Sequence, residues 1–453
     1  MSAIRMGLSS NFSVLVAALV LMLPGLPRPV HAEGEAAAAE KPPAAAWTSQ
    51  EYLEEVWNRE KLTGDWLGLR TEMAERGLDF EVTLSHFGQW VASGGVESPR
   101  GAYGGKADFR WNLDATKLAG LWEGLAFNVH AESRWGNDIL GDAGAFTLPN
   151  APLLYPLPGG YDGTELTGLL AIQDFAGGKF QVLVGKLHAF DMVTGLFPNV
   201  VDYGLKGFIN ANAYQSILPW GRWLNLSQLG VAAWKVTDGL PTTGAMAVGQ
   251  SSTTDNWDID DSFGSGVGLM VFHRFVWEME EKLGYIYVGV GASTKQYGSF
   301  DPKDFTDIPG GGLTDTSKKT PWSVAVYLYQ KVWQAEKNDK RFAQIFMGFS
   351  VADENPSFAR WDVFGSVELF GAMASRSGDR IGIAGWYTKL TDDFQEINSD
   401  VGNSLRGTWG FETYYNIEIN PWLHLTPDIQ FVMNQNNGDN LAVIPGIRLV
   451  IDF

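Results

Sequence analysis

The chain has 453 residues, contains no cysteine and carries a formal net charge of −19. This acidic balance argues against a nucleic-acid partner, and the lack of cysteine excludes disulfides, thiolate nucleophiles and thiol-based metal sites. Aromatic residues make up 13% of the chain and glycine occurs 53 times, which is unusual for a soluble exported protein.

The N-terminus has the pattern of a secretory signal. An apolar stretch at residues 13–26 follows Arg5, and Val30-His31-Ala32 supplies a small-residue cleavage site. We therefore expect residues 1–32 to be a signal peptide cleaved after Ala32, with an uncleaved anchor helix as the alternative. Because the signal holds Arg5 and Arg28, its removal brings the net charge from −19 to about −21. No later stretch reaches the length of an apolar spanning helix.

Residues 33–46 are rich in Ala, Glu and Pro and predict a flexible tether, since they have no apolar face to bury. Residues 47–77 follow with a helical period. A capping box at residues 48–51 begins one helix, Gly64 interrupts it, and Asp65 is placed to begin a second helix that stops at Gly77. This part is too small for its own core, so we expect a periplasmic segment that packs against the rest of the chain.

From residue 78 onward the hydrophobic period changes from 3.6 to 2, which is typical of strands. Residues 109–115 and 125–134 each alternate an apolar face with a polar one. Three strands near the C-terminus, at residues 409–419, 423–433 and 447–453, do the same. The last strand sets Ile447, Leu449, Ile451 and Phe453 against Arg448 and Asp452.

Three features favour a membrane barrel over a soluble sandwich. The strands are long enough for a tilted bilayer crossing. The chain ends at Phe453 on a strand whose edge needs a partner. Aromatic residues lie at the ends of the apolar faces, as in the interfacial girdles of membrane barrels. The aromatic set is Trp322, Tyr327, Trp361, Trp386, Trp409 and Trp422. At roughly 46 residues per hairpin, residues 78–453 predict an all-β, transmembrane antiparallel barrel of about 16 strands. Insertions at 141–162, 237–261 and 298–319 are candidates for outer or infolded loops.

Two end motifs resemble those of the carbohydrate-selective porins of the OprB family. Residues 62–70 read LTGDWLGLR, with Leu67 where the family has glycine, and residues 446–453 end in GIRLVIDF. Between them, Pro421-Trp422-Leu423 with the following Pro427-Asp428, and Val184-Gly185-Lys186, stand in the family's order. Asn434-Gln435-Asn436-Asn437 departs from the family's usual turn. The resemblance implies a 16-stranded barrel in the outer membrane of a Gram-negative bacterium that admits sugars by diffusion.

A channel for neutral sugars needs hydrogen-bonding groups of both signs and flat apolar surfaces. Pore-lining candidates that meet this need lie on the strands around residues 105–135 and 180–188. They are Arg110, Asn112, Asp114, His130, Glu132, Arg134, Trp135 and Lys186. The alternative is that these residues form wall salt bridges that only keep the lumen polar.

No histidine or carboxylate spacing predicts a metal site, and no motif predicts a cofactor or a nucleophile–base pair. The function expected is passive diffusion of mono- and small oligosaccharides, with no catalysis. A general, weakly cation-leaning porin is the alternative, followed by a barrel enzyme and a structural barrel. Expected partners are sugars as permeants, outer-membrane lipids and the barrel assembly machinery acting on Phe453. A homotrimer is left open.

Overall fold

The computed structural model describes most of the chain from residue 49 onward. The described residues are 49–95, 101–144, 148–154, 162–198, 200, 202–253, 259–307, 313–315, 318–336, 340–400, 405, 407–433 and 440–453. The expected signal peptide and tether, and the departure from the family at residues 434–437, lie outside them.

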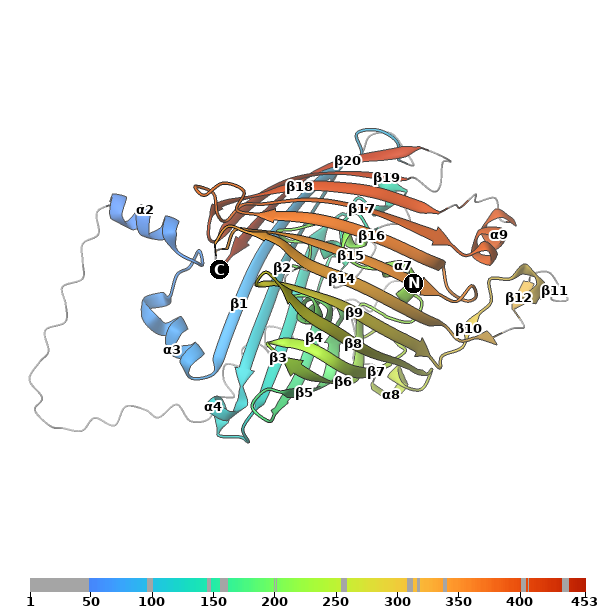
Figure 1. Cartoon of the computed structure of the whole chain (residues 1–453), viewed down its shortest axis with the longest axis horizontal. Helices are drawn as coiled ribbons and strands as arrows, with labels where there is room; N and C mark the ends of the chain where they lie inside the picture. The colour runs from blue at the N-terminus through green and yellow to red at the C-terminus, as the bar shows by residue number, and fades with distance from the viewer. Residues whose placement is uncertain are drawn as a thin grey trace, which may run out of the picture. The chain divides into compact units, whose positions relative to one another are not determined.

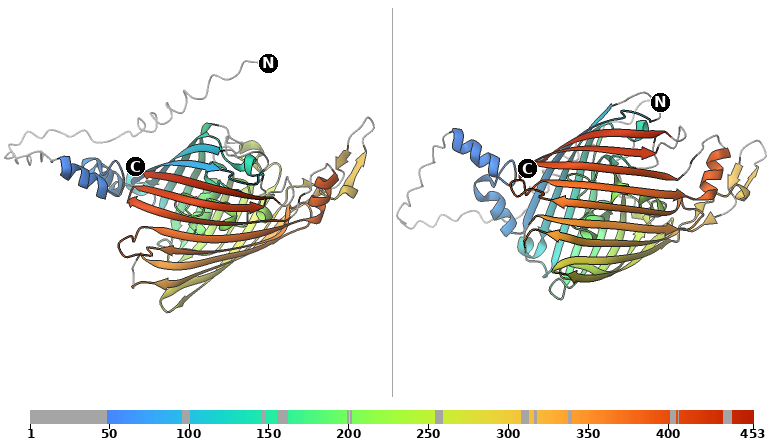
Figure 2. Two further views of the ribbon diagram at one scale, coloured as in Figure 1. Left: turned by 90° about the horizontal axis from the view of Figure 1, so that it is seen from above. Right: turned by 45° about the horizontal axis from the view of Figure 1, so that its top comes forward.

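Sixteen antiparallel strands form one closed barrel, which confirms the predicted strand number (Figures 1 and 2). Each strand pairs with the next barrel strand along the chain, and the last pairs back with the first. The strands are β1 (Leu78–Trp90), β2 (Gly101–Asp114), β3 (Leu125–Gly136), β4 (Gly163–Phe175), β5 (Phe180–His188), β6 (Ser227–Thr237), β7 (Leu240–Gly249), β8 (Val267–Met279), β9 (Lys282–Ser293), β14 (Trp322–Gln334), β15 (Phe342–Ala352), β16 (Ala359–Phe370), β17 (Arg380–Leu390), β18 (Thr408–Asn420), β19 (Leu423–Met433) and β20 (Leu441–Asp452).

The helices are short, and within the described residues none is long and apolar enough to cross a bilayer. They are α2 (Ser49–Asn58), η1 (Trp66–Gly68), α3 (Leu69–Glu75), α4 (Ala115–Ala119), α5 (Leu140–Ala143), η2 (Pro152–Leu154), α6 (Ala189–Leu196), η3 (Ala211–Ala213), α7 (Ile217–Trp220), α8 (Ile259–Ser262), η4 (Pro302–Asp304) and α9 (Asp392–Asp400). Helices α2 and α3 lie within the segment that was expected to be helical, on either side of Gly64.

The period-2 pattern assigns the two faces of the barrel wall. On β20, Arg448 is 1% exposed while its neighbour Ile447 is 46% exposed. On β2, Lys106 and Asp108 are buried inside, whereas the rings of Phe109 and Trp111 stack on each other. On these two strands, charged side chains therefore face the lumen and the apolar side chains between them face lipid, because alternate strand residues point to opposite faces.

The barrel closes between β1 and β20, where Thr83 stands opposite Asp452. The Thr83 hydroxyl donates to the Asp452 carboxylate at 2.9 Å, and the amide of Phe453 donates to the Val82 carbonyl at 2.9 Å. The final edge expected at Phe453 is thus paired, and the closed ring leaves no wall strand with a free edge.

The aromatic girdle differs from the expectation at two positions. Trp322 and Trp409 are exposed on the outer face, but Tyr327 and Trp386 are buried and face the lumen. The reason is the alternation of faces along a strand. Tyr327 is five residues after Trp322 on one strand, so the two side chains point to opposite faces. Trp386 pairs with Gly410, the neighbour of Trp409, so Trp386 lies on the face opposite to that of Trp409. An odd offset reverses the face in a period-2 element.

The long connections gather at one end of the barrel, away from α4 and the C-terminus (Figures 1 and 2). The connection between β9 and β14 forms two small sheets, β10 (Tyr297–Gly298) with β13 (Lys318–Lys319) and β11 (Phe305–Asp307) with β12 (Leu313–Asp315). Because such barrels have short periplasmic turns and longer outer loops, this end is the outer one.

Residues 237–261 are only in part the loop that was expected. Strand β7 occupies much of this range, and Asp238 and Gly239 make a two-residue hairpin turn with φ of 52° and 76°. Residues 237–249 therefore belong to wall strands and their turn, and the connection to β8 begins after Gly249.

The lumen holds a different segment, which the sequence did not single out. Residues 189–198 and 202–226 run between β5 and β6 and carry α6, η3 and α7; we call them the infolded segment. The large apolar cluster inside the barrel includes Phe190, Phe197 and Trp223 from this segment together with Tyr287 and Phe346 from the wall. The interior of the barrel is therefore partly packed by the infolded segment.

Candidate functional site

Two arginines that point inward from the barrel wall contact the infolded segment. Arg448, on β20, donates to the carbonyl oxygens of Gly204 and Gly207. Arg380, on β17, contacts the Asp202 carboxylate at 2.5 Å and also pairs with Glu368. These contacts satisfy main-chain oxygens that would otherwise lose hydrogen bonds in a narrow space.

A wall carboxylate completes the attachment. The two oxygens of Glu412 accept from the backbone amides of Ile209 and Asn210 at 2.8 and 2.9 Å. The Asn210 side chain donates to Gln430 at 3.0 Å. Residues 202–210 are therefore bound to the wall through both donors and acceptors, which fixes this part of the infolded segment in one place.

A second cluster attaches α6 to strands β2, β3 and β5, and we call it the charged centre. It comprises Lys106, Asp108, His130, Glu132, His188 and Asp191. The Lys106 ammonium contacts Glu132, and lies 3.3 Å from Asp108. His130 and Glu132 are fully buried, so they do not contact a permeant in this conformation.

Asp191 is the member of the charged centre that comes from the infolded segment. Its carboxylate lies 3.0 Å from His130 Nδ1, and the Tyr203 hydroxyl donates to it at 2.7 Å. Burial alone would raise the pKa of Asp191, but the nearby His130 and His188 lower it below its ordinary value. The pKa of the Tyr203 hydroxyl is raised by burial and by Asp191.

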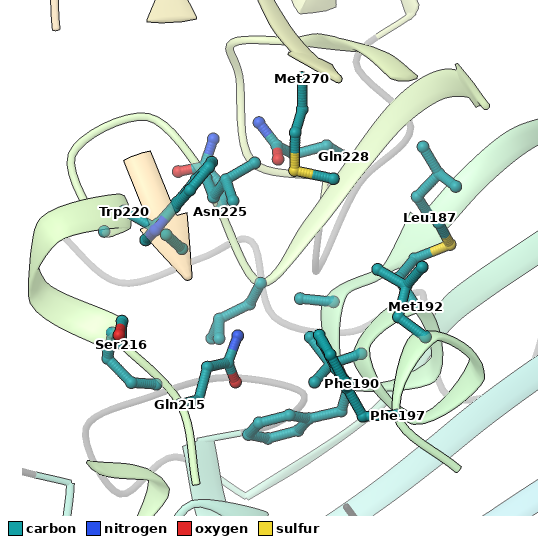
Figure 3. A pocket seen from close by; sticks show the side chains of 18 of the residues that line it. Leu187, Phe190, Met192, Phe197, Gln215, Ser216, Trp220, Asn225, Gln228 and Met270 are labelled. Carbon is teal, nitrogen blue, oxygen red and sulfur yellow. The ribbon is translucent and has the colours of Figure 1, made fainter. Parts of the chain in front are cut away.

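An apolar cavity of about 170 Å³ lies between the infolded segment and the wall (Figure 3). Its walls combine aromatic, thioether and aliphatic groups with a few amides. The residues labelled in Figure 3 are Leu187, Phe190, Met192, Phe197, Gln215, Ser216, Trp220, Asn225, Gln228 and Met270. Such a surface offers flat apolar faces beside hydrogen-bonding amides, the two features that a sugar ring requires.

The predicted pore-lining residues divide into groups. His130 and Glu132 meet in the charged centre, and Arg134 is buried against Asp138 at 2.8 Å. Lys186 is buried on β5, at 2% exposure. For these four residues the buried position agrees better with the alternative of structural wall interactions.

The other four predicted residues lie elsewhere. Arg110 keeps part of its side chain exposed and covers the ring of Tyr203 at 4.2 Å. Asn112 is exposed and accepts from the Asn128 side chain at 2.7 Å.

Asp114 ends β2 and caps α4 through the amides of Thr116 and Lys117. Trp135 is next to the inward Arg134 and so projects to the outer face, where its ring contacts His86. A lumen contact was expected for Trp135, and its parity on the strand excludes one.

Several site residues escaped the sequence reasoning. Asp202, Tyr203 and Asp191 lie in a stretch without a clear period, and Arg380 and Glu412 lie on wall strands far along the chain from that stretch. The sequence signal for such residues is a polar position on a strand whose other face is apolar. This signal places Arg448 inside the barrel.

A closed 16-stranded barrel with a polar, partly obstructed lumen defines a porin of the bacterial outer membrane. A family model described as "Carbohydrate-selective porin, OprB family" matches residues 98–453. The chain belongs to the OprB family and is a carbohydrate porin.

Similar proteins agree with this assignment. The chain is 23% identical to Porin B of Pseudomonas aeruginosa over 443 residues, covering 87% of this chain and 92% of that protein. A high-pH structure of Pseudomonas putida OprB matches with a TM-score of 0.72 at 18% identity, covering 87% of this chain and 99% of that one. A low-pH structure of the same protein matches with a TM-score of 0.53 at 16% identity, with the same coverage. These structures support the fold.

Proposed function

We propose that neutral mono- and small oligosaccharides diffuse passively past the infolded segment and leave chemically unchanged. The observation that carries this proposal is a set of partly exposed side chains of both signs around residues 202–206. The exposed side-chain fractions are 14% for Arg110, 28% for Asp202 and 33% for Lys206.

Both charge signs serve a neutral, hydroxyl-rich permeant. A sugar hydroxyl donates to the Asp202 carboxylate and accepts from the Arg110 guanidinium or the Lys206 ammonium. A wall of one sign would favour an ion of the opposite sign instead. The exposed Asn112 adds a neutral donor and acceptor.

Liposome swelling tests this function directly. The purified chain, reconstituted in vesicles, is expected to admit glucose and maltose faster than protein-free vesicles do. Swelling at the protein-free rate for both sugars would contradict the proposal.

The second candidate is a general, weakly cation-leaning porin, which the net charge of −19 favours. Planar-bilayer recordings separate the two functions. A sugar-selective channel shows a current that falls as maltose is added, whereas a general porin shows cation-biased reversal potentials without such a block.

We also propose the organisation of the exported chain. Residues 1–32 are removed on export, residues 33–46 form a tether, residues 47–77 are periplasmic, and residues 78–453 form the barrel, with outer-membrane lipids on its apolar face and Phe453 offered to the assembly machinery. Intact-mass measurement of the membrane-extracted protein checks the first step. The expected N-terminus is Glu33, and a mass that includes residues 1–32 would overturn it.

A further inference from the structure

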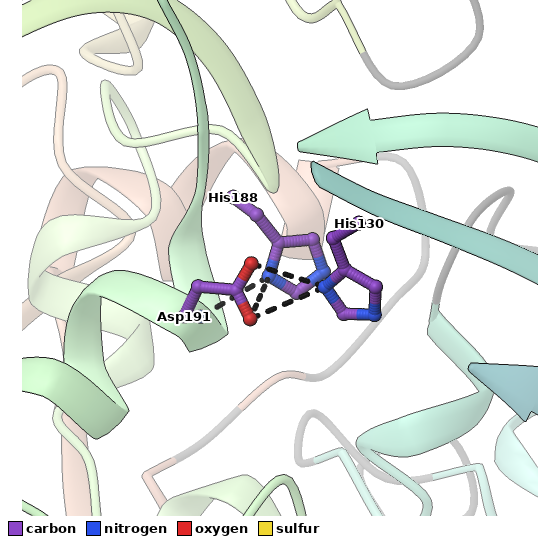
Figure 4. A group of neighbouring side chains, drawn as sticks. All are labelled: His130, His188 and Asp191. Atoms are coloured by element: carbon purple, nitrogen blue, oxygen red, sulfur yellow. Dashed lines mark hydrogen bonds and ion pairs between the residues drawn. The ribbon is translucent and has the colours of Figure 1, made fainter. Parts of the chain in front are cut away.

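Three side chains from separate elements converge inside the charged centre. His130 comes from β3, His188 from the end of β5 and Asp191 from α6, and one ligand atom of each lies within 4.8 Å of the others (Figure 4). The Asp191 carboxylate lies 3.0 Å from Nδ1 of His130 and 3.6 Å from Nδ1 of His188. Both values approach the edge of a tetrahedron, about 3.3 Å, that bonds of about 2.0–2.1 Å to a metal would produce.

The opposite nitrogen of each imidazole faces a wall carboxylate. Nε2 of His130 is 3.0 Å from Asp108, and Nε2 of His188 is 3.3 Å from Glu132. Metal-binding histidines commonly donate their second N–H to a carboxylate in this way, which fixes the tautomer and orients the ring.

His188 shows which of its nitrogens accepts. The backbone amide of Asp191 donates to His188 Nδ1 at 3.1 Å, so this atom presents a lone pair and Nε2 carries the hydrogen. Nδ1 is thus already in the protonation state that a metal ligand requires, and a bound ion would take the place of this amide contact.

The charge around the three ligands tolerates a divalent cation. Asp108, Glu132 and Asp191 supply three carboxylates, and Lys106 and Arg110 pair with Asp108 and Glu132. With neutral imidazoles, the Asp191 carboxylate supplies a negative ligand charge that an incoming cation offsets.

We propose that His130, His188 and Asp191 form a binding site for a divalent transition-metal ion of the Zn²⁺ class. Imidazole ligands select this class over Ca²⁺ and Mg²⁺, which prefer oxygen. A water molecule completes four-coordination, with the Tyr203 hydroxyl, 2.7 Å from Asp191, placed to hold it. The proton between His130 Nδ1 and Asp191 passes to solvent as the ion binds.

Occupancy would cross-link two wall strands and the infolded segment. Because α6 begins directly after His188, the ion joins β3, β5 and α6 at one point. The site is therefore placed to stiffen the infolded segment, independently of which solute the channel admits.

Titration of the tag-free, full-length protein in detergent tests the proposal. Zn²⁺ added to metal-free protein is expected to bind with one equivalent in calorimetry. Co²⁺ is expected to give the visible absorption bands of a tetrahedral site, and X-ray absorption of the zinc form is expected to show two imidazole ligands. Absence of stoichiometric binding, or a zinc spectrum with oxygen ligands only, would overturn the site.

Variants locate the ion. His188→Gln and Asp191→Asn are expected to weaken Zn²⁺ affinity at least about 100-fold, and Asp108→Asn about 10–100-fold as a residue that orients a ligand. His86→Gln is the matched control, because His86 pairs with Tyr103 on the outer face. Unchanged binding in His188→Gln refutes the assignment. If a variant fails to fold, the Co²⁺ and zinc spectra of the unmodified protein still decide whether the site exists. Sugar-driven swelling is a separate measurement that tests the proposed function.

Discussion

The Arg70 guanidinium donates to the main-chain oxygen of Phe453 at 2.9 Å, so the first recognisable motif of the chain contacts its last residue. The backbone amide of Leu62 likewise donates to the main-chain carbonyl oxygen of Asp452 at 2.8 Å. Arg70 also lies over the rings of Trp66 and Phe80, at 5.0 and 5.4 Å. The two motifs that carry the family resemblance are therefore joined at the seam where the barrel closes.

Replacement of Arg70 by alanine is expected to destabilise the barrel by roughly 1–3 kcal/mol, because the charged hydrogen bond and the stacking on two rings are both lost. Urea-dependent unfolding of the reconstituted protein measures this change. Arg76→Ala is the control: Arg76 pairs with Glu72 and both side chains are exposed, so its loss is expected to stay within about 0.5 kcal/mol. Equal effects of the two substitutions would contradict the importance of the seam.

The sequence predicted the wall well because a period of two is a local property. The faces of β2, β3 and β20 follow from alternation alone, and so does the inward position of Arg448. The predicted faces of Tyr327, Trp386 and Trp135 are wrong because they follow from aromatic character and not from position along the strand.

The interior was not predictable in the same way. His130, His188 and Asp191 are brought together by strand register and by the course of the infolded segment. The infolded segment itself is apolar, with Phe197 and Trp223 buried among wall side chains. It therefore lacks the polar composition by which loops are predicted, since a loop that packs inside a barrel needs an apolar surface of its own.

Arg448→Met is expected to loosen the infolded segment. The carbonyl oxygens of Gly204 and Gly207 lose their donor, and buried Asp428 loses a cation 3.8 Å away. Leaving such groups unpaired costs about 3–5 kcal/mol for a buried ion pair. Single-channel recordings are expected to show larger and noisier currents.

Arg360→Ala is the control for this change, because Arg360 pairs with Glu354 while both remain exposed. Currents like those of the unmodified protein are expected for it. If Arg448→Met also left the current unchanged, residues 202–210 would not limit conduction.

Phe197→Ala is expected to destabilise the packing of the infolded segment by about 3–5 kcal/mol. The Phe197 ring contacts Tyr287 at 5.0 Å and Tyr327 at 5.4 Å, and all three side chains are buried. Limited proteolysis of the reconstituted barrel measures the effect as faster cleavage between β5 and β6. The outer-face substitution Phe349→Ala serves as the control and should leave this cleavage rate unchanged.

Arg110→Ala is expected to shift ion selectivity toward cations. Arg110 is a partly exposed lumen cation beside Tyr203, and its removal leaves the acidic groups less balanced. Reversal potentials across a salt gradient measure the shift. The maltose concentration that halves the current should rise about 3–10-fold, which corresponds to the loss of one hydrogen bond to the sugar. A reversal potential identical to that of the unmodified channel would show that Arg110 does not face the ion path.

The lowered pKa of Asp191 links the stability of the infolded segment to pH. A carboxyl group whose pKa is lower in the folded state stabilises that state above its unfolded pKa, near 3.8, and this contribution is lost as the pH falls toward the folded value. At pH 5 we therefore expect unmodified protein to exceed Asp191→Asn in unfolding free energy. Below about pH 4 the difference should shrink, because protonation removes the charge that the substitution has already removed. Unfolding titrations of both proteins at matched pH values between pH 5 and about pH 3 measure the difference, and a gap that widens over this range would show that the carboxylate is not stabilised by its histidine neighbours.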